Sequence, residues 1–286
     1  MKKLIIAILA VFVLAGFPPP LEASFHDTQI AHELFIYPVV RVTVGRSAGS
    51  GTVVFSALNE QGKYSTYVLT NHHVVNEAIT IADQWDSALG EMVKREKRDL
   101  VYVEIFEYKD ISTPIGTRKV EADIVIYNKD EDMALLKLRA ENQVANVARL
   151  KTKDEVEAFH VMEPSVAVGC SLSFPPLPTN GIITRKNFQV FGHPFHMSRS
   201  QIIYGNSGGA MFHEQSGKLI GIPSLVPIIG WGTPITHMGL FIPISRVYAW
   251  LEREHYDFLF DPERTETVCL EEREEAIKAK QKAQRR

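Results

Sequence analysis

The sequence predicts an all-β protein in two halves. Short runs rich in Val, Ile and Phe recur from residue 35 onward, and Gly, Pro, Asn or Asp bounds most of them, which is typical of β-strands. The chain turns polar and charged between Arg139 and His160, so we expect a linker there. Each half then has about enough strands for one barrel. The strand candidates are residues 38–44, 51–55, 67–69, 100–106, 122–127, 133–138, 165–168, 181–184, 218–222 and 238–242.

The carboxyl end departs from this strand pattern. In residues 245–258, the apolar side chains of Val247, Trp250 and Leu251 follow helical spacing, so a short amphipathic helix is expected to close the second half. Residues 259–286 run from acidic to basic, which predicts a charged tail, either a polar helix or a frayed end. The alternative for this tail is a docking segment for a partner or an anionic surface.

Composition excludes several classes of protein. A chain that is 45% hydrophobic with a formal net charge of −3 is not disordered, and this near-neutral balance gives no reason to expect nucleic-acid binding. Its two cysteines, Cys170 and Cys269, are too few for a disulfide scaffold or a four-thiolate metal site, and we expect both to be unpaired. The scattered histidines lack metal-ligand spacing, so no metal and no cofactor is expected.

The amino-terminal residues have the layout of an export signal. A cationic start, Met1 to Lys3, precedes the apolar residues 4–17, which are followed by three prolines and by small residues at Ala23 and Ser24. The apolar run is shorter than the roughly 20 residues that span a bilayer. We therefore expect residues 1–24 to be a cleaved signal peptide. The alternatives are an uncleaved membrane anchor formed by residues 4–17 and a buried helix.

The segment Gly205-Asn206-Ser207-Gly208-Gly209 carries the strongest chemical signal. Attack of a Ser hydroxyl on a carbonyl produces a tetrahedral anion, and backbone N–H groups about 3 Å from the anion stabilise it. Glycines beside Ser207 permit the backbone conformations that direct such donors inward. We expect the N–H groups of Gly205 and Ser207 to form this oxyanion hole. The alternative is a simple glycine turn.

A Ser nucleophile requires a base and a group that orients the base. His73 follows an apolar strand candidate, and Asp132 stands at the start of another, where its carboxylate can accept the imidazole Nδ1–H. His72 competes with His73 as the base, and Asp123 competes with Asp132 as the acid. Chain order is His, Asp, Ser.

These segments resemble trypsin-like (chymotrypsin-fold) serine peptidases, most closely their HtrA/Deg-type branch. The resemblance covers roughly residues 35 to 255. It rests on four motifs in family order: Gly49-Ser50-Gly51, Thr70-Asn71-His72-His73-Val74, Asp132-Met133-Ala134-Leu135-Leu136-Lys137 and the segment from Gly205 to Gly209.

The resemblance implies two antiparallel six-stranded β-barrels with the active site between them and a helix at the carboxyl end. Residues 25–145 would form the first barrel, with His73 and Asp132, and residues 146–258 the second, with Ser207 and the closing helix. His73 is favoured over His72 because the family's base directly precedes Val-Val. Asp132 is favoured over Asp123 because a strand and an acidic turn precede the family's acid.

Alignment to the family places Gln201 at the base of the S1 pocket, with Ser224, Val226 and Gly239 on its walls. The absence of a carboxylate at these positions argues for an uncharged, apolar P1 residue. The charged residues 94–99 are expected to form an exposed hairpin or loop insertion. The carboxyl-terminal remainder is too short for a PDZ module, since small domains need at least about 50 residues.

The sequence therefore predicts an exported serine endopeptidase, periplasmic in a bacterium or secreted, that hydrolyses unfolded or exposed polypeptide segments through an acyl-enzyme. The alternative is a protease-fold protein that binds peptide segments but turns over little. Polypeptides are the expected partners, and a membrane is one only if the amino-terminal segment stays uncleaved. The oligomeric state does not follow from these residues.

Overall fold

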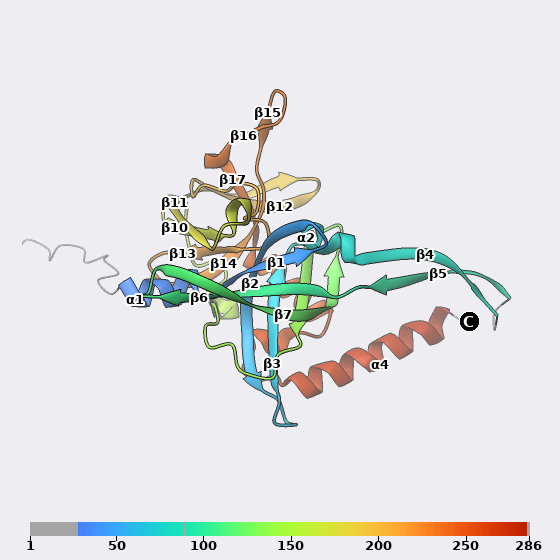
Figure 1. Ribbon diagram of the computed structural model, residues 1–286. Coiled ribbons are helices and arrows are strands. Elements are labelled where there is room, and N and C mark those ends of the chain that lie inside the picture. The colour runs from blue at the N-terminus through green and yellow to red at the C-terminus, as the bar shows by residue number, and fades with distance from the viewer. Residues whose placement is uncertain (1–27, 88–89, 285–286) are drawn as a thin grey trace, which may run out of the picture.

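The computed structural model describes residues 28–87 and 90–284, and the predicted signal or anchor segment lies outside them. Two antiparallel β-barrels dominate this part of the chain (Figure 1). The first is closed in the order β1-β2-β3-β8-β7-β6. Its strands are β1 (Val39–Val44), β2 (Ser47–Leu58), β3 (Tyr64–Thr70), β6 (Val101–Lys109), β7 (Thr113–Asn128) and β8 (Met133–Leu138).

The second barrel follows the order β13-β10-β11-β12-β17-β14, and pairing between β13 and β14 closes it. The short β9 (Arg149–Leu150) pairs parallel with β14 outside this ring. The prediction of two six-stranded barrels is confirmed. The strands of the second barrel are β10 (Pro164–Gly169), β11 (Leu177–Val190), β12 (His193–Ser198), β13 (Ala210–His213), β14 (Lys218–Leu225) and β17 (Gly239–Pro243).

Short elements connect the strands, and two hairpins lie outside the barrels. The charged insertion forms a two-stranded hairpin, β4 (Ile79–Asp86) and β5 (Glu91–Arg98), that extends away from the barrels (Figure 1). A second hairpin joins β15 (Ile228–Ile229) and β16 (Thr233–Pro234). The short helices are α1 (Thr28–Ala31), η1 (His32–Ile36), α2 (His72–Val75), η2 (Asn76–Ala78), η3 (Lys153–Glu155), η4 (Ser171–Ser173), η5 (Thr236–Met238) and η6 (Asp257–Leu259).

The closing helix α3 (Ile244–Arg253) starts directly after β17 and is shorter than the sequence pattern suggests. His255 adopts a φ of 59°, a left-handed conformation that does not continue an α-helix. Trp250 and Leu251 are buried, as their helical spacing requires. No helix in the described residues is long and apolar enough to cross a membrane.

Apolar side chains form three clusters. One fills the first barrel and contains Val42 and Leu136, and a smaller one in the second barrel contains Met211 and Phe241. The largest joins residues of both barrels to the carboxyl-terminal helices, with Trp250 among them. Because this cluster is continuous, the two barrels share one buried interface and hold a fixed relation to each other.

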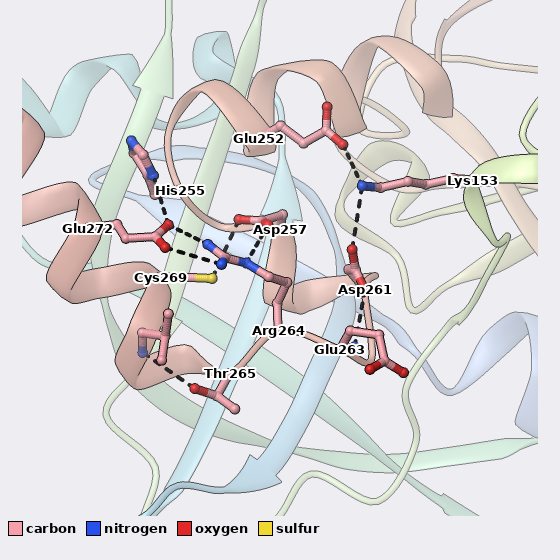
Figure 2. A network of polar contacts seen from close by, with 11 residues as sticks. Lys153, Glu252, His255, Asp257, Asp261, Glu263, Arg264, Thr265, Cys269 and Glu272 are labelled. Carbon is pink, nitrogen blue, oxygen red and sulfur yellow. Dashed lines mark hydrogen bonds and ion pairs between the residues drawn. The ribbon is translucent and has the colours of Figure 1, made fainter.

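The carboxyl-terminal helix α4 (Glu266–Gln284) is docked at its base. Cys269 is fully buried, and both cysteines are free. Figure 2 shows Arg264 bonded to Asp257 and Glu272, which fixes the turn that leads into the helix. The remainder of α4 carries mainly exposed charged residues.

Glu266 attaches the start of α4 to the first barrel. Its carboxylate accepts hydrogen bonds from the Tyr67 hydroxyl (2.6 Å) and from Lys137 Nζ (2.7 Å). Burial alone would raise the pKa of Glu266, but the hydrogen bonds from Lys137 and Tyr67 outweigh it and lower the pKa below its ordinary value of 4.5. Ionised Glu266 therefore stabilises the folded state at neutral pH. This contribution to stability begins to fall when the pH drops below the ordinary pKa of 4.5. It is lost once the pH has fallen through the lower pKa of the folded state.

The substitution Glu266→Gln is expected to lower the free energy of unfolding at pH 7 by about 1 to 3 kcal/mol, because the amide oxygen accepts from Tyr67 and Lys137 without the negative charge that strengthens these hydrogen bonds. The difference from wild type should shrink as the pH falls below 4.5, where the wild-type carboxylate becomes protonated. Urea titrations at several pH values measure both effects.

Glu274→Gln on the same helix is the matched control. Within the described residues Glu274 pairs only with Lys278, at 3.5 Å, and both side chains are more than 70% exposed, so its loss should be close to neutral. Equal effects of the two substitutions, or a Glu266→Gln effect that does not depend on pH, would contradict the docking role of Glu266.

Candidate active site

His73 lies at the end of β3, where the chain leaves the first barrel. Asn71 is still extended, with φ −84° and ψ 151°, and α2 begins at the next residue. The His73 backbone N–H donates to Asp132 Oδ1 at 3.0 Å, and its Nδ1 lies 2.9 Å from both carboxylate oxygens. Because a carboxylate only accepts, Nδ1 carries a proton, and in the neutral ring this tautomer leaves the lone pair on Nε2. The His73 side chain is 44% exposed and lines a cavity.

Asp132 stands in the turn between β7 and β8, with a φ of 55°. The Asn128 side chain accepts a hydrogen bond from the Glu131 N–H at 2.9 Å and so shapes this turn. The Asp132 carboxylate also accepts from the Ser224 hydroxyl of β14 at 2.7 Å, and its backbone carbonyl accepts from Asn71 Nδ2 at 2.8 Å. Asp132 is therefore held by groups from both barrels.

The two competing residues have other partners. The His72 ring packs on Tyr127 at 5.2 Å between ring centroids, and burial lowers the pKa of His72. Asp123 forms a bidentate pair with Arg139, at 2.9 and 2.7 Å, on the exposed side of β7. In the described part of the chain, Asp123 has no hydrogen bond to a histidine.

The loop that contains Ser207 is fixed by its backbone hydrogen bonds. The Tyr204 carbonyl accepts from the Leu172 N–H at 2.8 Å, and the Asn206 carbonyl accepts from the Gly209 N–H at 2.9 Å. In a trans peptide the carbonyl and the following N–H point in opposite directions. The N–H groups of Gly205 and Ser207 thus face away from these partners, and neither donates to a protein acceptor in the described residues.

Gly205 and Gly208 satisfy steric requirements of this loop. Gly205 has a φ of 99°, and a Cβ there would lie 2.5 Å from the Cys170 carbonyl oxygen. A Cβ on Gly208, where φ is 82°, would lie 2.3 Å from the Ser50 carbonyl oxygen. Only glycine combines these φ values with such close backbone approach.

A cavity of about 680 Å³ brings His73, Asp132 and Ser207 together between the barrels. No hydrogen bond joins the Ser207 hydroxyl to the His73 ring in the described residues, although both line this cavity. Catalytic hydrogen bonds are often long in ligand-free enzymes. The other lining residues are mainly apolar or aromatic and include Val190, Phe191, Phe195, Ile202, Ile203, Tyr204, Leu225, Val226 and Ile228.

The residues expected around the S1 pocket divide into two groups. Ser224 and Val226 line the cavity, although the Ser224 hydroxyl is bonded to Asp132. Gln201, expected at the base of the pocket, is exposed and does not line the cavity. Gly239 does not line it either, because Ile202 packs against it, and a Cβ on Gly239 would lie 2.4 Å from Ile202 Cδ1.

Sequence reasoning missed Ile202, which is 3% exposed and lines the cavity one residue beyond the position assigned to the base. The signal that could have identified it is the apolar pair at 202 and 203, directly after polar Gln201. An apolar base agrees with the expected apolar P1 preference. Within residues 28–87 and 90–284, no group of three or more His, Cys, Asp or Glu side chains is arranged to hold a metal ion.

Comparison with known proteins identifies the family. The sequence pattern of the trypsin-like peptidase domain matches residues 49–222, well over half of the chain. The serine protease Do-like HtrA of Lactococcus lactis subsp. lactis (strain IL1403) is 30% identical over 145 residues, which are 46% of this chain and 34% of that protein. The chain therefore spans about a third of the length of this curated relative.

Solved structures show the same fold. The HtrA-type protease AlgW with tripeptide superposes with a TM-score of 0.57 at 21% identity, over 81% of this chain and 64% of that chain. A variant of AlgW with tripeptide gives the same TM-score and identity over 80% and 64% of the two chains. The chain thus covers slightly less than two thirds of these structures. On its matched domain and its fold, the chain belongs to the trypsin-like peptidase family.

Proposed function

We propose that this protein is a serine endopeptidase in which Ser207 is the nucleophile, His73 the general base and Asp132 the group that orients the base. The observation that carries the proposal is the hydrogen bond between His73 Nδ1 and the Asp132 carboxylate, 2.9 Å long, in the cavity that also contains Ser207. Membership of the trypsin-like peptidase family supports the same assignment.

The reaction would proceed in two steps. Ser207 Oγ attacks the carbonyl carbon of the substrate while His73 Nε2 accepts the hydroxyl proton, and the C–N bond then breaks as His73 returns that proton to the leaving amine. Water repeats the sequence on the resulting acyl-enzyme and releases the acid. Asp132 stabilises the imidazolium in both steps and keeps its own charge.

The tetrahedral intermediate would be stabilised by the N–H groups of Gly205 and Ser207. Both groups lack a protein acceptor in the described residues, and the carbonyls that precede them are hydrogen-bonded on the opposite side of their peptide planes. Donors that are fixed before the reaction need no reorganisation when the charge develops.

The substrates would be extended polypeptide segments with an apolar P1 side chain. Ile202 and Val226 give part of the cavity an apolar lining. Of the carboxylates that also line it, Glu131 is paired with Arg253 and Asp132 with His73. The AlgW structures contain a tripeptide, which agrees with a peptide ligand for this fold.

One observation favours a second candidate function. Because no hydrogen bond joins Ser207 to His73 in the described residues, the protein can be a peptide-binding member of the fold with little turnover. Residue identity does not separate the two functions, whereas covalent reactivity of Ser207 does.

A fluorophosphonate probe is expected to label folded wild-type protein, because it reacts with a Ser hydroxyl that a base activates. Ser207→Ala should remove the labelling, and the same substitution should abolish degradation of casein. Gel fluorescence and peptide mapping measure the first, and release of soluble fragments measures the second.

Ser112→Ala serves as the control, because Ser112 lies on an exposed turn and its hydroxyl forms a hydrogen bond only with His32 among the described residues. It should be labelled like wild type. The peptidase assignment would be contradicted by absence of labelling of folded wild type or by undiminished labelling of Ser207→Ala. Absence of labelling in wild type that still binds casein would favour the peptide-binding alternative.

We also propose that the protein is exported. The support is the cationic start, the apolar run of residues 4–17 and the small residues that follow them. Amino-terminal sequencing of protein expressed in a secreting host should find a mature end near Ser24. Retention of Met1 in the membrane fraction would instead support the uncleaved anchor, and retention of Met1 in the cytosol would contradict export.

A further inference from the structure

Ser50 of the first barrel contacts the nucleophile loop of the second barrel at two points. Its backbone N–H donates to the Ser207 carbonyl at 2.8 Å, and its hydroxyl donates to the Gly205 carbonyl at 2.6 Å. The side chain is fully buried in β2, and its own carbonyl accepts from Thr70 Oγ1 at 2.7 Å. Ser50 is therefore fixed by its own barrel while it contacts the other.

The Ser50 hydroxyl also accepts a hydrogen bond from the Cys170 N–H at 2.7 Å. One hydroxyl thus joins two segments of the second barrel, the nucleophile loop at Gly205 and the start of η4 at Cys170. These two segments pack so closely that a Cβ on Gly205 would collide with the Cys170 carbonyl oxygen. The Ser50 hydroxyl thus donates one hydrogen bond and accepts another, as a buried hydroxyl requires.

The segment that begins at Cys170 determines the direction of the Gly205 N–H. Its Leu172 N–H holds the Tyr204 carbonyl, and the Gly205 N–H belongs to the same peptide unit. A half-turn of that unit would exchange the carbonyl and the N–H, and the carbonyl oxygen would then face the cavity. The orientation of a single peptide therefore decides whether an oxyanion meets a donor or an acceptor.

This segment is strained and needs external support. Leu172 and Ser173 have φ values of 50° and 64°, in the left-handed region that costs a non-glycine residue on the order of 1 kcal/mol or more. Two groups of the first barrel hold it at its ends. These are the Ser50 hydroxyl at Cys170 and the Arg41 guanidinium, whose Nη1 donates to the Ser173 carbonyl at 2.5 Å.

We propose that Ser50 is a positioning residue for the oxyanion hole, whose hydroxyl keeps the Gly205 N–H directed into the cavity. The inference rests on the proposed function, because an oxyanion hole has a role only if Ser207 attacks a carbonyl. In the described residues Ser50 does not line the cavity and has no hydrogen bond to the Ser207 hydroxyl. It acts through Gly205 and through the segment from Cys170 to Ser173.

Thr52 provides a matched control on the same strand and face. Its hydroxyl is equally buried, at 1% exposure, but has no hydrogen-bond partner in the described residues. Thr52→Val deletes a buried hydroxyl without removing a contact, whereas Ser50→Ala deletes the bridge. A general need for hydroxyls in β2 would make the two substitutions equivalent.

The test compares wild type, Ser50→Ala and Thr52→Val with two inhibitors of one peptide sequence. The Ser207 hydroxyl adds to a peptidyl trifluoromethyl ketone and places a charged oxygen in the oxyanion hole, whereas the corresponding alcohol binds without forming an adduct.

Ser50→Ala should lower kcat by about 10- to 100-fold, somewhat less than the loss of an oxyanion donor itself. The substitution should weaken binding of the ketone by a similar factor. KM and the affinity for the alcohol should stay within about twofold of the wild-type values. Thr52→Val should behave as wild type.

Inhibition constants do not depend on how much of the sample is folded, so the comparison survives a loss of stability in Ser50→Ala. If that variant yields no folded protein, Ser50→Cys, which retains a weaker donor, should show the same selective loss for the ketone. Equal weakening of ketone and alcohol, or wild-type values for both, would overturn the positioning role. An inactive wild type would instead overturn the proposed function, and an active wild type with an inactive Ser207→Ala variant leaves only the role of Ser50 in question.

Discussion

The proposed active site depends on the position of one carboxylate, that of Asp132. It accepts the backbone N–H and Nδ1 of His73 from the first barrel and the Ser224 hydroxyl from the second. The Asp132 side chain is 21% exposed and its two oxygens accept all three of these hydrogen bonds, so its orientation is fixed before any substrate arrives. Displacement of either barrel would break at least one of these bonds. The relation between the barrels and the direction of the His73 ring are therefore coupled.

Apolar packing and polar contacts have separate roles between the barrels. The large cluster around Trp250 holds the two halves together, but apolar contact is not directional and does not select one angle of a peptide plane. Directed contacts at the cavity supply that selection, from Asp132 to Ser224 and from Ser50 to Gly205. A trypsin-like site built in this way derives its rigidity from the barrels and its catalytic geometry from a few hydrogen bonds between them.

Local sequence patterns predicted the two barrels and the His, Asp and Ser that meet in the cavity, because strands and motifs are local properties of the chain. They do not determine features that depend on contacts between distant residues. Gln201 and Ile202 are neighbours, and only the packing of Ile202 on Gly239 decides which of them reaches the cavity. In the same way, the hydroxyls of Ser224 and Ser50 have partners 92 and 155 residues away. The docked base of α4 depends on Glu266, whose partners lie in the first barrel.

The most direct test of this account is kcat for peptide hydrolysis by Asp132→Asn, with Asp123→Asn as the control. The account predicts a loss of about 10⁴ in kcat for Asp132→Asn, because an amide no longer holds the His73 ring in the required tautomer, with unchanged circular dichroism. Asp123→Asn breaks only an exposed pair with Arg139 and should retain wild-type kcat. Retention of kcat within about tenfold by Asp132→Asn, or an equal loss in Asp123→Asn, would contradict the central role of Asp132.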